Sequence, residues 1–177
     1  KMFGIPLEKI LTVYVGGSFI RRELVEGSDI DFFIIIKNDE DLDELIKVGL
    51  VKYTIKGVRM RPHIYSLGEL ESQKYKAPRI GGRGAPPGGL IINLLEFKVV
   101  WGEELNLYEI GKIQSDDEIL EIFVKRARIM IARPKKDVVR WLKRISKHMF
   151  FVVHYETRVR LNKEFPFHRK KLLKRFK

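Results

Sequence analysis

A run of two glycines, a serine and two aspartates lies between two strand-like segments, and it constrains the fold more than any other stretch. Residues 11–15 (LTVYV) are rich in β-branched and aromatic side chains, which is typical of a strand. The Gly-Gly-Ser sequence at residues 16–18 ends that strand. Asp29 and Asp31 then precede residues 32–36 (FFIII), a short unbroken apolar run that predicts a strand buried on both faces.

The two aspartates predict a metal site. Side chains two apart on a strand share a face, so Asp29 and Asp31 lie side by side. Neighbouring carboxylates repel each other, and a divalent cation removes that conflict. Oxygen ligands suit Mg²⁺, with Mn²⁺ as the alternative. The structural alternative is a solvated Asp-x-Asp pair.

The Gly-Gly-Ser turn supplies what a metal-bound phosphate needs. Gly16 and Gly17 let backbone N–H groups approach closely, and the Ser18 hydroxyl adds a donor. We expect a short helix over residues 19–24 that begins at this turn. Since a helix N-terminus favours anions, this helix would strengthen the prediction of a phosphate site. On its own, Gly-Gly-Ser is also an ordinary structural turn.

The stretch GGSFIRRELVEGSDIDFFIII resembles the signature of the nucleotidyltransferases of the DNA polymerase β superfamily. That signature has an apolar residue, Gly, Gly or Ser, a spacer, and then Asp-apolar-Asp or Glu. The positions that match it are Gly16, Gly17, Ser18, Asp29, Ile30 and Asp31, with Arg21 and Ser28 at positions where family members often carry the same residues.

The resemblance implies a Mg²⁺-dependent enzyme that transfers a nucleoside monophosphate from a nucleoside triphosphate to an acceptor hydroxyl. It implies that Asp29 and Asp31 are the catalytic residues and the metal ligands. It also implies a nucleotide-binding set consisting of Gly16, Gly17, Ser18 and Arg21. For the acceptor, an RNA end, a small molecule and a protein hydroxyl all remain open.

The sequence departs from the family where a third carboxylate is often found. The corresponding strand, residues 58–65 (VRMRPHIY), holds no Asp or Glu. Three alternatives remain open. His63 acts as the base, or the catalytic set is incomplete, or a carboxylate comes from elsewhere. The carboxylates that could serve are Glu69, Glu71 and Glu96.

Basic residues offer further phosphate contacts. Arg59 and Arg61 share a face of their strand and either bind phosphate or lie in solvent. Near the C-terminus, LNKEFPFHRKK resembles the end of the helical domain in kanamycin- and streptomycin-type nucleotidyltransferases, which closes over the nucleotide. This resemblance implies that Lys170 or Lys171 contacts the triphosphate.

We expect an α/β (α+β) fold, with a nucleotidyltransferase-type mixed β-sheet and flanking helices over residues 1–112, followed by a basic α-helical domain over residues 113–177. The elements expected between and after the motif parts are a helix at 41–48, strands at 51–55 and 58–65, a helix at 67–75, a Gly/Pro-rich loop at 77–89, a helix at 90–100, a helix at 116–132 and a last helix beginning at Pro134. The apolar residues at helical spacing in that last helix predict its core face, which consists of Val138, Trp141, Leu142, Ile145, Met149 and Val152.

Charge divides the chain of 177 residues into two halves. Residues 1–124 hold 16 Lys and Arg against 20 Asp and Glu, whereas residues 125–177 hold 19 against 3. The basic half favours RNA or another polyanion as partner, or it is a solvated helical face. The competing interpretation of function is therefore a catalytically degenerate module that binds nucleic acid or a partner protein through this half.

Composition excludes several other classes of protein. The chain has no cysteine, which excludes disulfides, thiolate metal sites and thiol nucleophiles. Its apolar runs are too short for a membrane span, so we expect a cytoplasmic protein without membrane contact.

Overall fold

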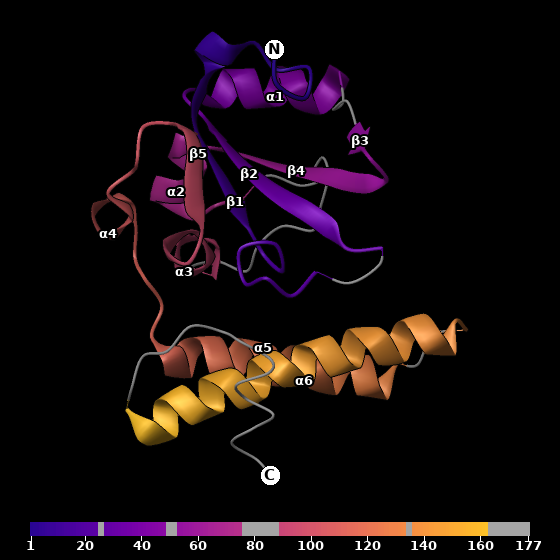
Figure 1. Ribbon diagram of the computed structural model, residues 1–177. Coiled ribbons are helices and arrows are strands. Elements are labelled where there is room, and N and C mark those ends of the chain that lie inside the picture. Colours follow the sequence, from indigo (N-terminus) through magenta and orange to yellow (C-terminus); the bar gives the residue numbers. More distant parts are fainter. Residues whose placement is uncertain (25–26, 49–52, 76–88, 134–135, 163–177) are drawn as a thin grey trace. The chain divides into compact units, whose positions relative to one another are not determined.

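The computed structural model describes residues 1–24, 27–48, 53–75, 89–133 and 136–162 (Figure 1). The chain divides into two compact units, Lys1–Ile113 and Gln114–Lys177. Among the described residues, the first unit contains the sheet and four α-helices, and the second contains two long helices. The predicted fold class, a mixed sheet with flanking helices followed by a helical region, is confirmed.

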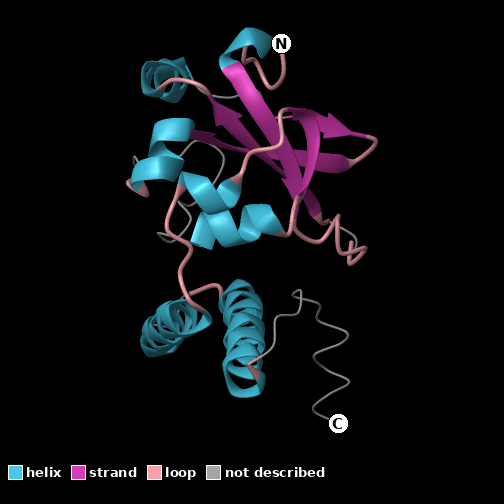
Figure 2. Ribbon diagram, turned by 90° about the vertical axis from the view of Figure 1, so that its left-hand side faces the viewer, coloured by secondary structure: helices cyan, strands magenta, loops and turns pink. Residues whose placement is uncertain are grey.

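The first unit is built on a five-stranded mixed sheet in the order β3-β4-β2-β1-β5. Its strands are labelled in Figure 1 and coloured magenta in Figure 2. A 3₁₀ helix, Leu7–Lys9, leads into the first strand. β2 and β4 run parallel, and the other neighbouring pairs are antiparallel. The strands are β1 (Ile10–Gly16), β2 (Asp29–Ile36), β3 (Tyr53–Ile55), β4 (Val58–Ser66) and β5 (Lys98–Gly102).

Apolar clusters cover both faces of the sheet, as the unbroken run in β2 predicts. Ile34, Ile35 and Ile36 are fully buried and alternate between the two faces. The helices of this unit are α1 (Asp39–Val48), α2 (Leu67–Ser72), α3 (Gly89–Leu95) and α4 (Leu107–Ile110).

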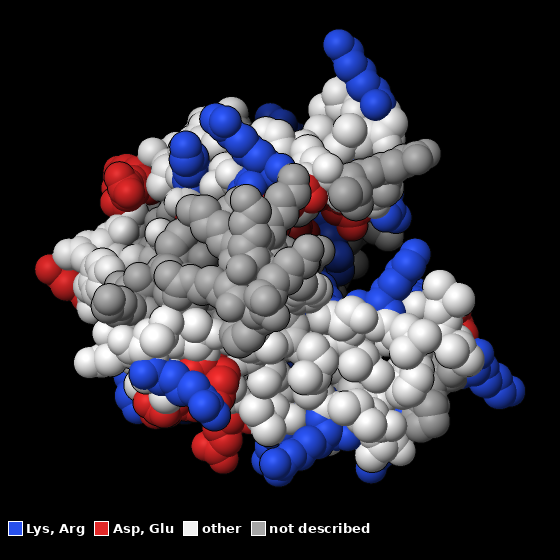
Figure 3. All heavy atoms as spheres, turned by 60° about the horizontal axis from the view of Figure 1, so that its bottom comes forward, with Lys and Arg blue, Asp and Glu red and all other residues white. Residues whose placement is uncertain are grey.

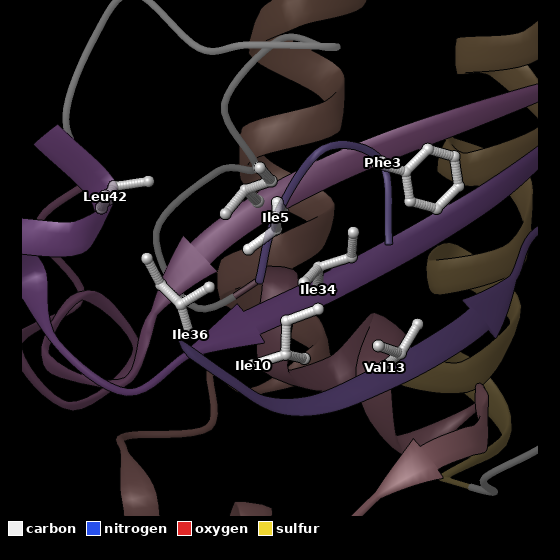
Figure 4. Packing of buried hydrophobic residues seen from close by; sticks show 8 residues of the cluster. Phe3, Ile5, Ile10, Val13, Ile34, Ile36 and Leu42 are labelled. Carbon is white, nitrogen blue, oxygen red and sulfur yellow. The ribbon is translucent and has the colours of Figure 1, made fainter. Parts of the chain in front are cut away.

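The two clusters use different elements. The N-terminal segment and α1 contribute to one of them, which contains Phe3, Ile5, Ile10, Val13, Ile34, Ile36, Leu42 and Ile64 (Figure 4). Helices α2, α3 and α4 contribute to the other, which contains Tyr14, Ile35, Tyr65, Leu70, Leu90, Ile91, Leu94 and Leu107.

Two predicted helices in this unit are wrong. Residues 17–22 form consecutive turns rather than the start of a helix over 19–24, because Gly17 and Arg22 both have positive φ. The predicted helix over 90–100 stops at Leu95, and residues 98–100 belong to β5, which pairs with β1. The predicted loop at 77–89 falls almost wholly outside the described residues.

The second unit is an antiparallel pair of helices, α5 (Asp116–Ala132) and α6 (Val138–Leu161). The predicted bounds of α5 are confirmed, and the Ser115–Glu118 capping box explains its start. Phe123 of α5 stacks on Phe151 and Tyr155 of α6, with ring centroids 4.8 and 5.6 Å away. Pro134 lies outside the described residues. None of the described helices is long and apolar enough to span a membrane.

The face of α6 that packs against α5 differs in part from the predicted one. Val138, Leu142 and Met149 were expected in the core but are 55%, 51% and 40% exposed. Trp141, from the same predicted face, does contact α5, because its Nε1 donates to the Met130 carbonyl. Tyr155 and Arg158, which were not predicted, also contact α5: Tyr155 stacks on Phe123, and Arg158 pairs with Asp116.

Candidate active site

One end of β2 and β4 carries charged side chains on the sheet face that becomes apolar further along the strands. Because the two strands are parallel and in register, residues at alternate positions form neighbouring pairs on that face. The register sets Asp29 beside Arg59, Asp31 beside Arg61, Phe33 beside His63 and Ile35 beside Tyr65.

The Gly-Gly-Ser turn lies directly against Asp31. Gly16 ends β1 and pairs with Asp31 across the antiparallel β1–β2 ladder. Gly17 follows with φ +70°, and a Cβ placed on it would come within 2.8 Å of Asp31 Oδ2. Only glycine allows the backbone both this conformation and this approach. The predicted turn and the second predicted aspartate therefore meet in space.

Glycine is also required at position 16, for a different reason. A Cβ placed on it would lie 2.4 Å from the Phe97 ring, which also packs against Phe33 with ring centroids 4.9 Å apart. Sequence reasoning did not identify Phe97, since no spacing rule links residue 97 to residue 16. This ring supports the end of β1 from the face that carries Asp31.

Tyr14, two residues before Gly16, anchors β1 beneath the turn. Its ring is 2% exposed, and its hydroxyl accepts a hydrogen bond of 3.3 Å from the Leu105 backbone N–H. Burial raises the pKa of this hydroxyl above its ordinary value, with a smaller contribution from Glu104. The tyrosine is therefore a neutral structural group.

Asp29 is held by two arginines of β4. Arg59 Nη2 lies 2.8 Å from Asp29 Oδ1, and Arg61 Nη1 lies 3.8 Å from Oδ2. Asp29 Oδ1 is buried. Because its contact with Arg59 is an ion pair without hydrogen-bond geometry, this oxygen accepts no hydrogen bond among the described residues. The sequence predicted that these arginines either bind phosphate or lie in solvent. In the described structure both pair with a carboxylate, which was not predicted.

Asp31 is held by His63. His63 Nε2 lies 3.2 Å from Asp31 Oδ1, and the imidazole stacks on Phe33 with ring centroids 4.7 Å apart. The His63 side chain is 11% exposed. Of the residues considered for the missing third carboxylate, His63 is the one that contacts an aspartate of the motif through a described hydrogen bond.

The remaining predicted nucleotide-binding residues lie in the turn region. Ser18 is half-buried, and its backbone carbonyl accepts a 2.8 Å hydrogen bond from the Glu23 N–H. The Arg21 side chain pairs with Glu23, with Nε 3.0 Å from Oε2. Because this segment is a turn, a helix N-terminus does not contribute to anion binding here.

Of the three glutamates considered, two are at the wrong end of the strands. Glu69 is buried in the capping box of α2, directly after β4. The register places that end seven residues along from Asp29, which is about 23 Å at the usual rise per residue. Glu71 follows in the same helix. Glu96 precedes Phe97 and so lies near Gly16 and Asp31 along the sheet.

Among the described residues, no group of three or more His, Asp or Glu side chains is arranged to hold a metal ion. The candidate ligands are therefore the two predicted carboxylates alone. This fits Mg²⁺, which commonly takes one or two protein carboxylates and completes its octahedron with water and substrate phosphates. The buried Oδ1 of Asp29, which has no hydrogen bond, and the close approach of Gly17 to Asp31 are compatible with that arrangement.

Comparisons with known proteins agree with this geometry. Residues 5–57 match the family model described as polymerase beta, nucleotidyltransferase. A search of curated proteins finds no significant match. Among solved structures, the chain is similar to spectinomycin adenyltransferase AAD(9) from Enterococcus faecialis, solved with ATP and spectinomycin. The TM-score is 0.50 at 14% identity, over 89% of this chain and 71% of that one.

The matched residues span β1, the Gly-Gly-Ser turn and β2, which carry the sequence signature, and the structural similarity extends over most of the chain. Together they confirm the predicted resemblance: residues 5–57 match the nucleotidyltransferase family model, and the fold is similar to that of an adenyltransferase.

Proposed function

We propose that this protein is a Mg²⁺-dependent nucleotidyltransferase that moves a nucleoside monophosphate from a nucleoside triphosphate to an acceptor hydroxyl. The observation that carries the proposal is the close approach of Gly17 to the Asp31 carboxylate, which supports a phosphate-binding role for the turn and a metal-binding role for the aspartate. ATP in the crystal structure of the similar adenyltransferase supports a nucleoside triphosphate as donor.

Asp29 and Asp31 would hold the metal, with Mn²⁺ as an alternative ion. When bound, the ion would neutralise charge on the triphosphate and stabilise the entering and leaving oxygens at the α-phosphorus. The role of Asp31 would be to fix the metal beside the turn, since its Oδ2 faces Gly17 and its Oδ1 is oriented by His63. Asp29 would contribute an oxygen that is already sheltered from water.

The turn would hold the β- and γ-phosphates. The glycines at 16 and 17 would let backbone N–H groups approach the phosphates closely, and Ser18 would add a hydroxyl donor. The guanidinium of Arg21 would contribute a charged donor to the same phosphates. In the described structure Arg21 pairs with Glu23, with Nε 3.0 Å from Oε2.

Pyrophosphate would leave as the acceptor hydroxyl attacks the α-phosphorus. The acceptor proton requires a base, and Glu96 is the candidate carboxylate at this end of the sheet. Its position between α3 and β5, next to the phenylalanine that supports Gly16, favours it over Glu69 and Glu71.

Nucleotide binding measured by calorimetry tests the proposal. The wild type is titrated with ATP, GTP, CTP and UTP, each with Mg²⁺ and with EDTA, beside the Asp29→Asn/Asp31→Asn double variant. We expect binding that requires Mg²⁺ and is lost in the double variant. Glu40→Gln/Glu71→Gln removes the same charge from exposed positions at the other end of the strands and should bind like the wild type. Wild-type protein that binds none of the four nucleotides would refute the proposal.

A second candidate function, nucleic-acid binding by the helical unit, rests on one row of α6. Arg140, Lys143 and Lys147 are exposed and spaced to share a face of that helix. On the face shown in Figure 3, Lys and Arg side chains lie among uncharged atoms. RNA binding that weakens steeply with salt in the wild type, and is lost when these three residues become Gln, would support it.

A further inference from the structure

We propose that Arg59 is an internal counter-ion that occupies the Asp29 carboxylate in the metal-free protein and competes with a divalent cation for it. This inference rests on the Asp29–Asp31 metal site of the proposed function. It makes Arg59 a positioning residue that controls how the metal enters the site.

The geometry of the pair supports an exchange. Arg59 reaches Asp29 from the open side, because its side chain is 67% exposed while that of Asp29 is 22% exposed. The contact joins one guanidinium nitrogen to one oxygen at 2.8 Å and lacks hydrogen-bond geometry. An arginine held in this way can turn into solvent without disturbing β4, whereas the carboxylate stays in place on β2.

On β2 and β4 the charged side chains at this end of the sheet balance without a metal. Two carboxylates, Asp29 and Asp31, face two guanidinium groups, Arg59 and Arg61. A third carboxylate, which the family often carries on the neighbouring strand, would leave the site negative and attract a bare cation. In this chain that strand carries the arginines instead.

A consequence follows for the order of binding. A divalent cation that arrives alone meets an Asp29 carboxylate that the arginines already neutralise, and it has to displace Arg59 from that carboxylate. A cation already bound to a nucleoside triphosphate brings negative phosphates with it, which give the displaced guanidinium a new partner. The metal is therefore expected to enter with the nucleotide rather than before it.

A purely structural ion pair between β2 and β4 would behave differently. Removing Arg59 would then lower stability and either leave metal affinity unchanged or weaken it, because Asp29 would lose its orientation. The two roles give opposite signs for metal affinity.

The test is a titration of the full chain with Mn²⁺ in the absence of nucleotide, in which water proton relaxation reports the bound Mn²⁺. For Arg59→Gln we expect affinity about two- to fivefold tighter than wild type, the range that corresponds to partly exposed ion pairs. The gain should shrink at high salt, which screens the arginine charge in the wild type. Arg59→Lys, which keeps the charge, should restore most of the wild-type affinity.

Lys37→Gln is the matched control. It removes one positive charge from an exposed residue just beyond the far end of β2, and its Mn²⁺ affinity should equal that of the wild type. In an Asp29→Asn background, Arg59→Gln should have no further effect, because the carboxylate for which it competes is gone. Urea unfolding of each variant verifies that it is folded.

Unchanged or weaker Mn²⁺ affinity in Arg59→Gln would overturn the inference, and so would an equal gain in Lys37→Gln. The result is separable from the proposed function. If Arg59→Gln binds Mn²⁺ more tightly but the protein binds no nucleotide, the counter-ion role is supported and the proposed nucleotidyltransferase activity is refuted. If metal binding depends on nucleotide but Arg59→Gln leaves the affinity for Mn²⁺ alone unchanged, the proposed activity is supported and the counter-ion role is refuted.

Discussion

Gly17→Ala is the sharpest test of the site, because it changes one methyl group between the turn and Asp31. At φ +70° the added Cβ costs about 1–2 kcal/mol of strain in the left-handed region. It would also lie 2.8 Å from Asp31 Oδ2, too close for either atom to stay. The obstructing atom is the end of a side chain, so we expect the carboxylate to turn away while the backbone holds.

Two measurements separate these effects. The strain should lower the melting temperature of the first unit by roughly 4–8 °C for each kcal/mol in a domain of about 100 residues. The displaced carboxylate should weaken Mg²⁺-dependent nucleotide binding by about 10- to 100-fold, since a misplacement of about 1 Å has effects of this size. Thermal unfolding and calorimetry with Mg²⁺ report them independently.

Gly57→Ala is the matched control. Gly57 also has positive φ, +78°, but a Cβ there would meet nothing within 4 Å. Its substitution should cause a similar loss of stability with nucleotide binding kept. Equal loss of binding in both variants would show that strain alone is responsible, and wild-type binding in Gly17→Ala would refute the role of the Gly17–Asp31 contact.

Three further predictions concern stability. Arg158→Ala should cost about 1–3 kcal/mol in urea unfolding, because it leaves Asp116 without its half-buried 2.8 Å partner, whereas Arg160→Ala at a more exposed pair should cost under about 0.5 kcal/mol. Burial, reinforced by nearby cations, lowers the pKa of His148 below its ordinary 6.5, so the unfolded chain binds its proton first. Stability should fall as pH drops below about 6.5, and His148→Gln should flatten that part of the profile. Tyr14→Phe should lower stability by about 1 kcal/mol, since a backbone N–H loses its acceptor.

The elements that could be predicted are those whose pattern is local. The apolar run before the glycines and the one after the aspartates both form central strands, because a continuous apolar run is typical of a strand that is buried on both faces. The start of α5 was predicted for the same reason, since its acidic first turn lies at the N-terminus of an amphipathic segment. In each case neighbouring residues carry the whole signal.

The elements that could not be predicted depend on distant partners. Residues 98–100 continue an apolar run from α3, but they become a strand because the edge of β1 is available for pairing. The face of α6 that meets α5 is another case. Its apolar residues surround more of the helix than one stripe, so periodicity alone could not choose between Leu142 and Tyr155, and packing on Phe123 decides it.

The candidate site divides in the same way. The carboxylates and the glycines could be predicted because they form one continuous motif. Their partners could not, because the contact of Asp29 with Arg59 depends on the register of a parallel strand about thirty positions later. A signal was present in hindsight: Arg59, Arg61 and His63 are two apart, so they share a face, as the aspartates do.

That shared face decides what His63 can do. A carboxylate offers only acceptors, so in the 3.2 Å contact Nε2 carries the proton and donates it to Asp31 Oδ1. The nitrogen that faces the motif therefore cannot also take a proton from an acceptor hydroxyl, and stacking on Phe33 fixes the ring in that orientation. We therefore expect His63 to orient Asp31 rather than to act as the base in place of the absent carboxylate. With Glu69 committed to a helix cap at the other end of the strands, Glu96 is the strongest of the glutamates considered for that role.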